Sequence, residues 1–184
     1  MNSNSQKTQR KNTAATYKKL LPMVQGVILD YGAGLLEGTK VFQDNLFNAE
    51  AYEPFPRDDI HPDYTSVDQI NRKFDTIVCN CVLNVIDSEK ERREIVLSIW
   101  NLLEDGGNAF IMVRSVANVE AYIKTATTVG AHEYRFPNGV FQKGFTLAEL
   151  HRTIYDALCR DNHETVFEEI RGINPLGFKI TKIS

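Results

Sequence analysis

The chain has 184 residues, of which 42% are hydrophobic, and this is enough for a single domain with its own core. The three cysteines lack the number and spacing of a disulfide framework or a zinc site, so we expect reduced thiols, no metal and a cytoplasmic location. No apolar run approaches the length of a membrane span, and the first residues lack the apolar segment of a signal peptide. Composition thus argues against a membrane protein and against a disulfide-stapled secreted one.

The net charge of −3 is unevenly distributed along the chain. Residues 1–29 carry five basic residues and no acid, which leaves 16 of the 21 basic residues against all 24 acids, or about −8, in the remainder. We expect residues 1–13 to form a flexible basic arm and residues 14–184 to form the folded domain. Such an arm can contact a polyanion such as nucleic acid, although basic arms are often simply solvated.

The first half of the chain alternates between predicted helices and strands. A short helix is expected over residues 17–24, and the continuously apolar residues 27–29 indicate a strand covered on both faces, as in a parallel sheet. Inward-facing positions then recur at helical spacing, at Leu35, Thr39, Phe42 and Leu46. Further strands are predicted over residues 49–52, 64–66 and 74–79.

The second half begins with a strongly predicted helix over residues 87–104, capped by Asp87 or Ser88 and followed by two glycines. A strand over 109–113 precedes a long irregular segment, 115–145. Thr146 and Glu149 form a capping box that opens a helix, and its inward positions are expected to be Leu147, Leu150, Ile154 and Leu158. No helix fits between the last two strands, 165–170 and 178–183, so they should form an antiparallel hairpin.

These elements predict an α/β fold with one mostly parallel, seven-stranded sheet, helices on both of its faces and a C-terminal antiparallel hairpin. In such a sheet, ligands bind where the loops leave the carboxyl ends of the strands. The connections at this edge are therefore the places to look for a site.

A glycine-containing turn joins the first predicted strand to the next helix. It runs from Asp30 to Gly38 with the sequence DYGAGLLEG, and glycine there allows a positive φ and a close approach of ligand to backbone. Glu53 ends the second strand 19 residues after Gly34, where a carboxylate can accept hydrogen bonds from both hydroxyls of a ribose. The turn and the acid together favour a ligand that contains adenosine.

A nicotinamide dinucleotide is the alternative ligand of this kind. Its G-x-G-x-x-G fingerprint places a pyrophosphate on the helix N-terminus, but Gly38 comes one residue later than the third glycine of that pattern. Asp30, two residues before Gly32, would repel a diphosphate and suits a ligand that carries an ammonium and a sulfonium. These two features favour S-adenosylmethionine.

Four segments resemble the class I S-adenosylmethionine-dependent methyltransferases. Residues 27–34, VILDYGAG, resemble the first motif of that family, and Glu53 matches its ribose-binding acid. Residues 74–86, FDTIVCNCVLNVI, match the strand beneath the methionine part of the cofactor, and residues 102–107, LLEDGG, match the turn before the next strand. More narrowly, DYG at 30–32, YEP at 52–54 and VLNVI at 82–86 resemble a group of small bacterial and phage methyltransferases, some of them linked to DNA modification.

The resemblance implies a Rossmann-like domain that binds S-adenosylmethionine and releases S-adenosylhomocysteine. It assigns Asp30, Gly32 and Gly34 to the methionine end and Glu53 to the ribose. Ser66, Val67 or Asp68 would meet the adenine edge, and Asn80 would face the amino group. The further expected cofactor contacts are Tyr31, Ala33, Pro54, Cys81 and Val82. The adenine contact departs from the family, whose commonest pattern has an acid where Ser66 stands. Asp68 is the substitute.

The methyl acceptor is less well defined by the sequence. Segment 115–145 is expected to form a lid over the acceptor, with Arg114, His132 and Gln142 as candidate substrate contacts. Residues 80–83, NCVL, lack the prolines and the aromatic ring with which amino-methylating DNA enzymes hold a flipped base, which disfavours that chemistry. Cys81 as a nucleophile toward a pyrimidine ring is a further alternative.

The leading interpretation is a methyltransferase, with nucleic acid slightly favoured over a small molecule as acceptor because the lid is basic and aromatic. A catalytically inactive S-adenosylmethionine-binding partner of a modification complex is the second interpretation, and a nicotinamide-dependent oxidoreductase is the third. Apart from the acceptor, no partner and no oligomeric state is predicted.

Overall fold

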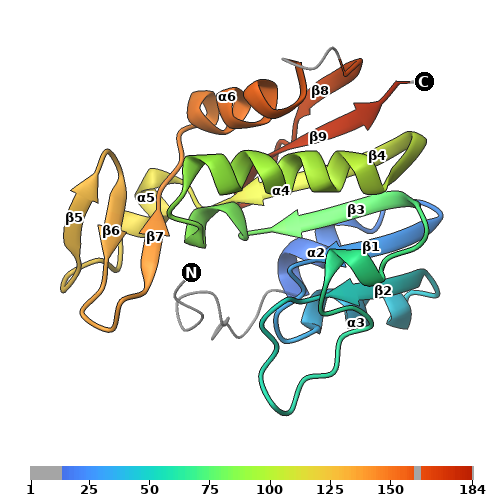
Figure 1. Cartoon of the computed structure of the whole chain (residues 1–184), viewed down its shortest axis with the longest axis horizontal. Helices are drawn as coiled ribbons and strands as arrows, with labels where there is room; N and C mark the ends of the chain where they lie inside the picture. Colours follow the sequence, from blue (N-terminus) through green and yellow to red (C-terminus); the bar gives the residue numbers. More distant parts are fainter. Residues whose placement is uncertain (1–13, 160–162, 184) are drawn as a thin grey trace.

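The computed structural model describes residues 14–159 and 163–183, so the predicted arm, 1–13, lies outside the described residues. A six-stranded sheet forms the body, in the order β2-β1-β3-β4-β9-β8 (Figure 1). Its strands are β1 (Val27–Tyr31), β2 (Asn48–Tyr52), β3 (Phe74–Asn80), β4 (Leu103–Val113), β8 (Thr165–Glu169) and β9 (Leu176–Lys182). The first four are parallel, and the β8–β9 hairpin joins β4 in antiparallel pairing, which confirms the predicted hairpin.

The prediction of a seven-stranded sheet is wrong, because residues 64–66 do not form a strand. A single isolated β-bridge forms there, in which Tyr64 pairs in parallel with Tyr52, the last residue of β2. The Asp63 carboxylate accepts a hydrogen bond from the N–H of Ala51, at 2.7 Å, and so takes the place of a backbone partner. Ser66 then caps a short 3-10 helix, η1 (Val67–Gln69), which ends the extended conformation.

Helices cover both faces of the sheet, as predicted (Figure 1). On one face lie α2 (Ala14–Leu20) and α3 (Glu37–Asp44), and on the other α4 (Glu89–Leu102) and α6 (Leu147–Leu158). Successive residues of a strand point to opposite faces, so the core is divided into two hydrophobic clusters. In β1, for example, Ile28 packs beneath α2 and α3, and Leu29 packs on the side of α4 and α6.

Two residues predicted to face inward lie at the surface. Leu46 is 97% exposed because α3 ends two residues earlier, and it adopts a positive φ of 67° in the turn that follows. Leu147 is 36% exposed, since it is the first residue of α6 and precedes the turn that contacts the sheet. The capping box of Thr146 and Glu149 is present as predicted, and Ser88 caps α4.

Segment 115–145 is more regular than the sequence indicates. It folds into α5 (Val116–Glu120) and a separate antiparallel sheet of β5 (Thr127–Gly130), β6 (Glu133–Arg135) and β7 (Phe141–Lys143), which projects from the body (Figure 1). Three-residue strands with polar outer positions leave little periodicity to detect. We call this unit, residues 115–145, the lid.

Buried charges join the lid to the body. Glu133 on β6 lies 3.4 Å from both Arg92 of α4 and Lys143 of β7, and Lys143 also pairs with Glu149 of α6 at 3.3 Å. The Arg92 and Lys143 side chains are only 6% and 10% exposed, so these contacts hold the lid in one orientation. Within the residues described, none of the helices is long and apolar enough to cross a lipid bilayer.

Candidate functional site: a cavity at the carboxyl ends of the parallel strands

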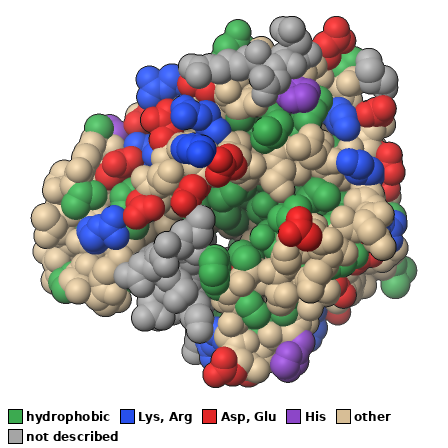
Figure 2. Space-filling view, viewed as in Figure 1, with side chains coloured by type: hydrophobic (Ala, Val, Ile, Leu, Met, Phe, Trp, Pro, Cys, Tyr) green, Lys and Arg blue, Asp and Glu red, His purple; other side chains and the backbone are tan. Residues whose placement is uncertain are grey.

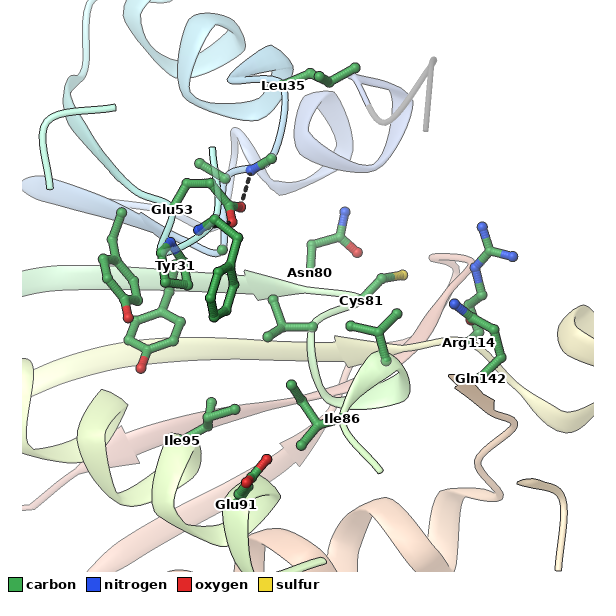
Figure 3. A pocket seen from close by; sticks show the side chains of 18 of the residues that line it. Tyr31, Leu35, Glu53, Asn80, Cys81, Ile86, Glu91, Ile95, Arg114 and Gln142 are labelled. Carbon is green, nitrogen blue, oxygen red and sulfur yellow. Dashed lines mark hydrogen bonds between the residues drawn. The ribbon is translucent and has the colours of Figure 1, made fainter. Parts of the chain in front are cut away.

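A cavity of about 690 Å³ opens where β1, β2 and β3 end, a volume within the range of about 300–1,000 Å³ usual for small-molecule sites. Hydrophobic side chains gather around a hollow near the middle of the face shown in Figure 2. Glu53 and Tyr31 lie at one end of the cavity and Arg114 and Gln142 at the other, with Asn80 and Cys81 between them (Figure 3). We call these the glycine-turn end and the lid end.

Glu53 and the glycine turn, which are predicted from the sequence to bind one ligand, are in direct contact. Oε2 of Glu53 accepts a hydrogen bond from the N–H of Gly34 at 2.8 Å, and Oε1 accepts one from the N–H of Phe55 at 3.0 Å (Figure 3). Burial raises the pKa of Glu53, and these two backbone hydrogen bonds oppose that shift. The carboxylate is 6% exposed and is thus oriented before any ligand arrives.

Gly32 and Cys81 shape the floor of the cavity through left-handed backbone conformations. Gly32 has a φ of 78°, and a Cβ added to it would lie 2.4 Å from Cγ2 of Val82. Cys81, directly after β3, has a φ of 61°, and its N–H donates to the carbonyl oxygen of Met112. The two loops therefore approach each other as closely as they do only because position 32 has no side chain.

Asp30 lies beneath the cavity and does not line it. It is fully buried and accepts hydrogen bonds from the hydroxyls of Tyr17 on α2, at 2.8 Å, and of Thr39 on α3, at 2.9 Å. Burial raises the pKa of Asp30 from 3.8 to about 6, against the opposing effect of these two donors. The group that reaches the cavity is Tyr17, which sequence reasoning missed.

The third glycine of the turn has a packing role. A Cβ on Gly38 would lie 2.2 Å from the ring of Tyr17, so the glycine lets α2 cross the first turn of α3. That crossing places the Tyr17 hydroxyl on Asp30. Burial raises the pKa of Tyr17 well above its ordinary value, so the hydroxyl keeps its proton and remains a donor at neutral pH.

Most of the other predicted cofactor residues line the cavity. These are Tyr31, Gly32, Ala33, Gly34, Pro54, Val67, Asn80, Cys81 and Val82. Asn80 is 8% exposed, and within the described part of the chain its Oδ1 is a buried atom without a hydrogen-bond partner. A buried acceptor of this kind at a cavity wall indicates a ligand that brings a donor.

Besides Asp30, the structure separates three predicted residues from the cavity. Ser66 and Asp68 are exposed, and the Ser66 hydroxyl accepts from the N–H of Asp68, so the adjacent Val67 is the residue of this segment that lines the wall. His132 sits in the turn between β5 and β6, where its carbonyl oxygen accepts from Gly144, and it is not among the lining residues. Arg114 and Gln142 do line the lid end.

The lid end combines one cation with aromatic rings. The Arg114 guanidinium carbon lies 4.9 Å above the centre of the Tyr122 ring, and Tyr122 stacks on Phe136 with an interplanar angle of 7°. Gln142 accepts hydrogen bonds from the Tyr122 hydroxyl, at 3.2 Å, and from the Asn84 side-chain amide, at 3.1 Å. Tyr122 and Phe136 stand out in the sequence only as aromatic residues of a polar segment.

Helix α4 forms a further wall that sequence reasoning did not assign. Glu91, Glu94, Ile95 and Ser98 contribute to it, and the Tyr31 hydroxyl donates to Ser98 at 3.3 Å. Because Glu94 lies one turn before Ser98, this acid flanks the part of the cavity nearer to Tyr31. Among the residues that the structure describes, the charged side chains of the lining are three acids, Glu53, Glu91 and Glu94, and one base, Arg114.

No protein-family model matches the sequence, and a search of curated protein sequences found no match either. Solved structures do match: DesVI of Streptomyces venezuelae has a TM-score of 0.67 at 16% identity, over 96% of this chain and 94% of DesVI. A Burkholderia thailandensis 1,6-didemethyltoxoflavin-N1-methyltransferase, with 1,6-didemethyltoxoflavin and S-adenosylhomocysteine bound, has a TM-score of 0.66 at 16% identity, over 95% of this chain and 80% of that one.

A third solved structure is CalS10 of Micromonospora echinaspora, an amino pentose methyltransferase with S-adenosylmethionine bound. It has a TM-score of 0.58 at 15% identity, over 93% of this chain and 89% of its own. At these identities the likeness establishes the fold, which is the Rossmann-like fold of S-adenosylmethionine-dependent methyltransferases.

Proposed function

We propose that this chain is an S-adenosylmethionine-dependent methyltransferase that acts on a small molecule. The observation that carries the proposal is the contact between Glu53 and the N–H of Gly34, which places an oriented carboxylate at the glycine turn, at one end of a large cavity. The fold supports it, because two of the solved structures above hold the methyl donor or its product.

The lining residues fit this cofactor. Glu53 would accept the ribose hydroxyls, and the backbone of Gly32 to Gly34 would lie against the methionine part, where position 32 has no side chain to obstruct it. The unpartnered Oδ1 of Asn80 would accept a hydrogen bond from the ammonium group. Val67, in place of Ser66 or Asp68, would contact the adenine.

The same residues fit a nicotinamide dinucleotide poorly. Asp30 carries a negative charge at neutral pH, since its pKa is about 6, and it lies directly before the glycine turn on which a diphosphate would rest. The negative charge of Asp30 suits a cationic ligand instead. This disfavours the oxidoreductase interpretation.

When bound, the cofactor supplies a methyl group on a sulfonium, which is already a strong electrophile, so the protein's main task is to position the acceptor in line with it. Arg114, Tyr122 and Gln142 are the residues placed to orient an acceptor at the lid end. The hydrophobic lining and the lid would exclude water from the reacting groups.

A small acceptor fits the cavity better than nucleic acid does. A polynucleotide requires several cations along its path, whereas the described lining has three carboxylates and one guanidinium. Two of the neighbours are a 1,6-didemethyltoxoflavin-N1-methyltransferase and an amino pentose methyltransferase, and the solved structures lend no support to the narrower resemblance to DNA-modification enzymes. The basic arm and the basic, aromatic lid are the sequence features that favour nucleic acid.

Two measurements test the proposal. Calorimetry with S-adenosylmethionine, S-adenosylhomocysteine and NAD should show binding of the first two only, and binding of NAD alone would overturn it. Incubation with a methyl-labelled donor and separate pools of metabolites, DNA and RNA should then label the metabolite pool. Label in DNA or RNA would overturn the small-molecule acceptor, and cofactor binding without any transfer would favour a catalytically inactive binding partner.

A further inference from the structure

We infer that the acceptor is a small planar organic acid that carries a neutral nitrogen, and that Arg114 binds its carboxylate. The inference rests on the proposed function and names its substrate class. It is carried by a second, smaller cavity, by the surroundings of Arg114 and by the side chains that line the lid end.

The second cavity, of about 260 Å³, adjoins the lid end of the first. The two cavities share Cys81, Arg114 and Tyr122, so these three residues stand between them. The remaining lining of the smaller cavity is Asn118 of α5 and the pair Asn174 and Pro175 from the loop between β8 and β9. An acceptor seated there can extend past Cys81 toward the cofactor cavity.

The positive charge of Arg114 is not balanced by a described acid of the protein. Its guanidinium lies on the Tyr122 ring, and none of the described carboxylates forms an ion pair with it. Arg135, which lies in the lid on β6, differs in this respect. It stacks on Phe141 in the same way but pairs with Asp87 at 3.0 Å and lines neither cavity.

The charge balance indicates a monoanion. A guanidinium stacked on a ring keeps its N–H edge available for a carboxylate, which it can bind with two parallel hydrogen bonds. The other polar side chains around it, Asn118 and Asn174, are neutral amides. A phosphate or a polyanion would need further cations, which the described lining does not supply.

The surfaces around Arg114 are flat. Tyr122 and Phe136 stack with ring centres 6.1 Å apart, and Tyr122 and Pro175 both line the smaller cavity. Faces of this kind favour a planar ring by offset stacking. The acceptor is therefore expected to be an aromatic or heteroaromatic acid.

Tyr122 and the loop between β8 and β9, which line the smaller cavity, are both held in place by the surrounding fold. The Tyr122 hydroxyl is hydrogen-bonded to Gln142 on one side. On the other, α2 contacts the loop between β8 and β9, where the Thr16 hydroxyl donates to the Asn174 carbonyl oxygen at 3.4 Å and Lys19 donates to that of Gly172 at 3.1 Å. A site ordered in advance loses less entropy when its ligand binds.

The residues at the lid end also restrict the acceptor atom. Among the described residues that line the smaller cavity, where the acid would be held, there is no histidine and no carboxylate to serve as general base. A neutral amine or ring nitrogen needs none. Its lone pair forms the new N–C bond, the C–S bond breaks with its electron pair left on sulfur, and an N–H proton of the methylated amine passes to water.

Binding to the protein loaded with S-adenosylhomocysteine tests the inference without catalysis. The probes are the three aminobenzoate isomers and their three carboxamides, which have the same shape and amine but no charge. We expect at least one aminobenzoate to bind at least tenfold more tightly than its carboxamide in calorimetry, and to accept label from a methyl-labelled donor. Equal binding of each acid and its amide, or binding of none of the acids, would overturn the inference.

Two arginine variants assign that preference to a residue. Arg114→Gln should abolish the preference for the acid while changing the affinity for S-adenosylhomocysteine less than twofold, and Arg135→Gln should retain it. An unchanged preference in Arg114→Gln would overturn the role of Arg114. If the wild-type chain fails to bind S-adenosylhomocysteine, the proposed function fails first, so the two failures are distinguishable.

Discussion

The two ends of the cavity are built in different ways. The glycine-turn end consists of short loops between adjacent parallel strands, and Glu53 reaches Gly34 across neighbouring strands with backbone donors as partners. The lid end is assembled from α5, β7 and the segment after β3, and its contacts are between side chains. Gln142, for instance, is bound by Asn84, 58 residues away in the chain.

Under the proposed function, this difference would separate binding of a common cofactor from choice of an acceptor. Backbone hydrogen bonds and a glycine without a side chain tolerate little variation, which suits a ligand that is always the same. The small sheet of the lid is joined to the body by buried ion pairs. Its exposed side chains can therefore change without disturbing the body, which suits selection among acceptors. The predictions below test whether the two ends are as independent as this comparison implies.

The largest effect concerns Asp30 and the pH dependence of stability. Its folded-state pKa, about 6, lies above the ordinary 3.8, so the folded protein retains a proton that the unfolded chain has released. The stabilising contribution of this group is complete below about pH 4 and is lost as pH rises through about 6, with a total of about 3 kcal/mol. Wild type should therefore lose about that much relative to Asp30→Asn between pH 4 and pH 7, measured by urea unfolding. A difference in stability between the two proteins that does not change with pH would contradict the raised pKa of Asp30.

The glycine-turn end should depend on Glu53 for affinity. Glu53→Ala removes the acceptor of the ribose hydroxyls and the partner of the Gly34 N–H, so binding of S-adenosylhomocysteine should weaken about 100-fold, or about 2.7 kcal/mol. Calorimetry measures this. Glu50→Ala is the matched control, because Glu50 lies on the same strand, pairs with Arg72 and does not line the cavity. A change below threefold in Glu53→Ala would refute the role of the acid.

The lid should loosen without affecting cofactor binding. Glu133→Gln leaves the buried Arg92 guanidinium without its carboxylate, and we expect a loss of about 2 kcal/mol in the free energy of unfolding. Faster hydrogen exchange should appear over residues 127–143, with the affinity for S-adenosylhomocysteine changed less than twofold. Glu89→Gln, which breaks an exposed pair with Arg93, should cost less than about 0.5 kcal/mol. A large loss of cofactor affinity in Glu133→Gln would mean that the two ends are coupled.

The smallest effect separates backbone conformation from contact. Gly32 and Gly106 have φ angles of 78° and 80°, so alanine at either should cost about 1 kcal/mol of stability. A Cβ at position 32 meets Val82, whereas one at 106 meets nothing within 4 Å. Only Gly32→Ala should therefore weaken S-adenosylhomocysteine, by about tenfold, in calorimetry. Equal affinities of the two variants for S-adenosylhomocysteine would show that the close approach of Gly32 to Val82 does not matter for cofactor binding.

Much of the glycine-turn end can be predicted from sequence because its signals are local. The turn after β1, the acid at the end of β2 and the segment after β3 are each a few residues long, and parallel pairing brings their ends together. The residue of segment 66–68 that lines the cavity was harder to predict. Ser66 resembles a strand-end residue in the sequence, but with Gln69 it forms a capping box, and Val67 is turned toward the cavity instead.

Other parts of the site depend on packing between distant residues. Tyr17 enters the cavity because Gly38 allows α2 to cross α3, and no periodicity within α2 reveals that crossing. The lid could not be derived as a sheet, since three-residue strands carry almost no pattern. His132 was a reasonable candidate by position, but the turn between β5 and β6 places it away from the cavity.

The sequence by itself determined the order of the elements, the terminal hairpin, the glycine turn and the acid that faces it, because turn chemistry and hydrophobic periodicity act over a few residues. Tertiary structure decided that the sheet has six strands, that Asp30 is buried behind Tyr17, and that Arg114 lies between two cavities without an ion-pair partner among the described residues. Burial, charge pairing and ring stacking are set by residues far apart in the chain, and these interactions exist only once the chain has folded.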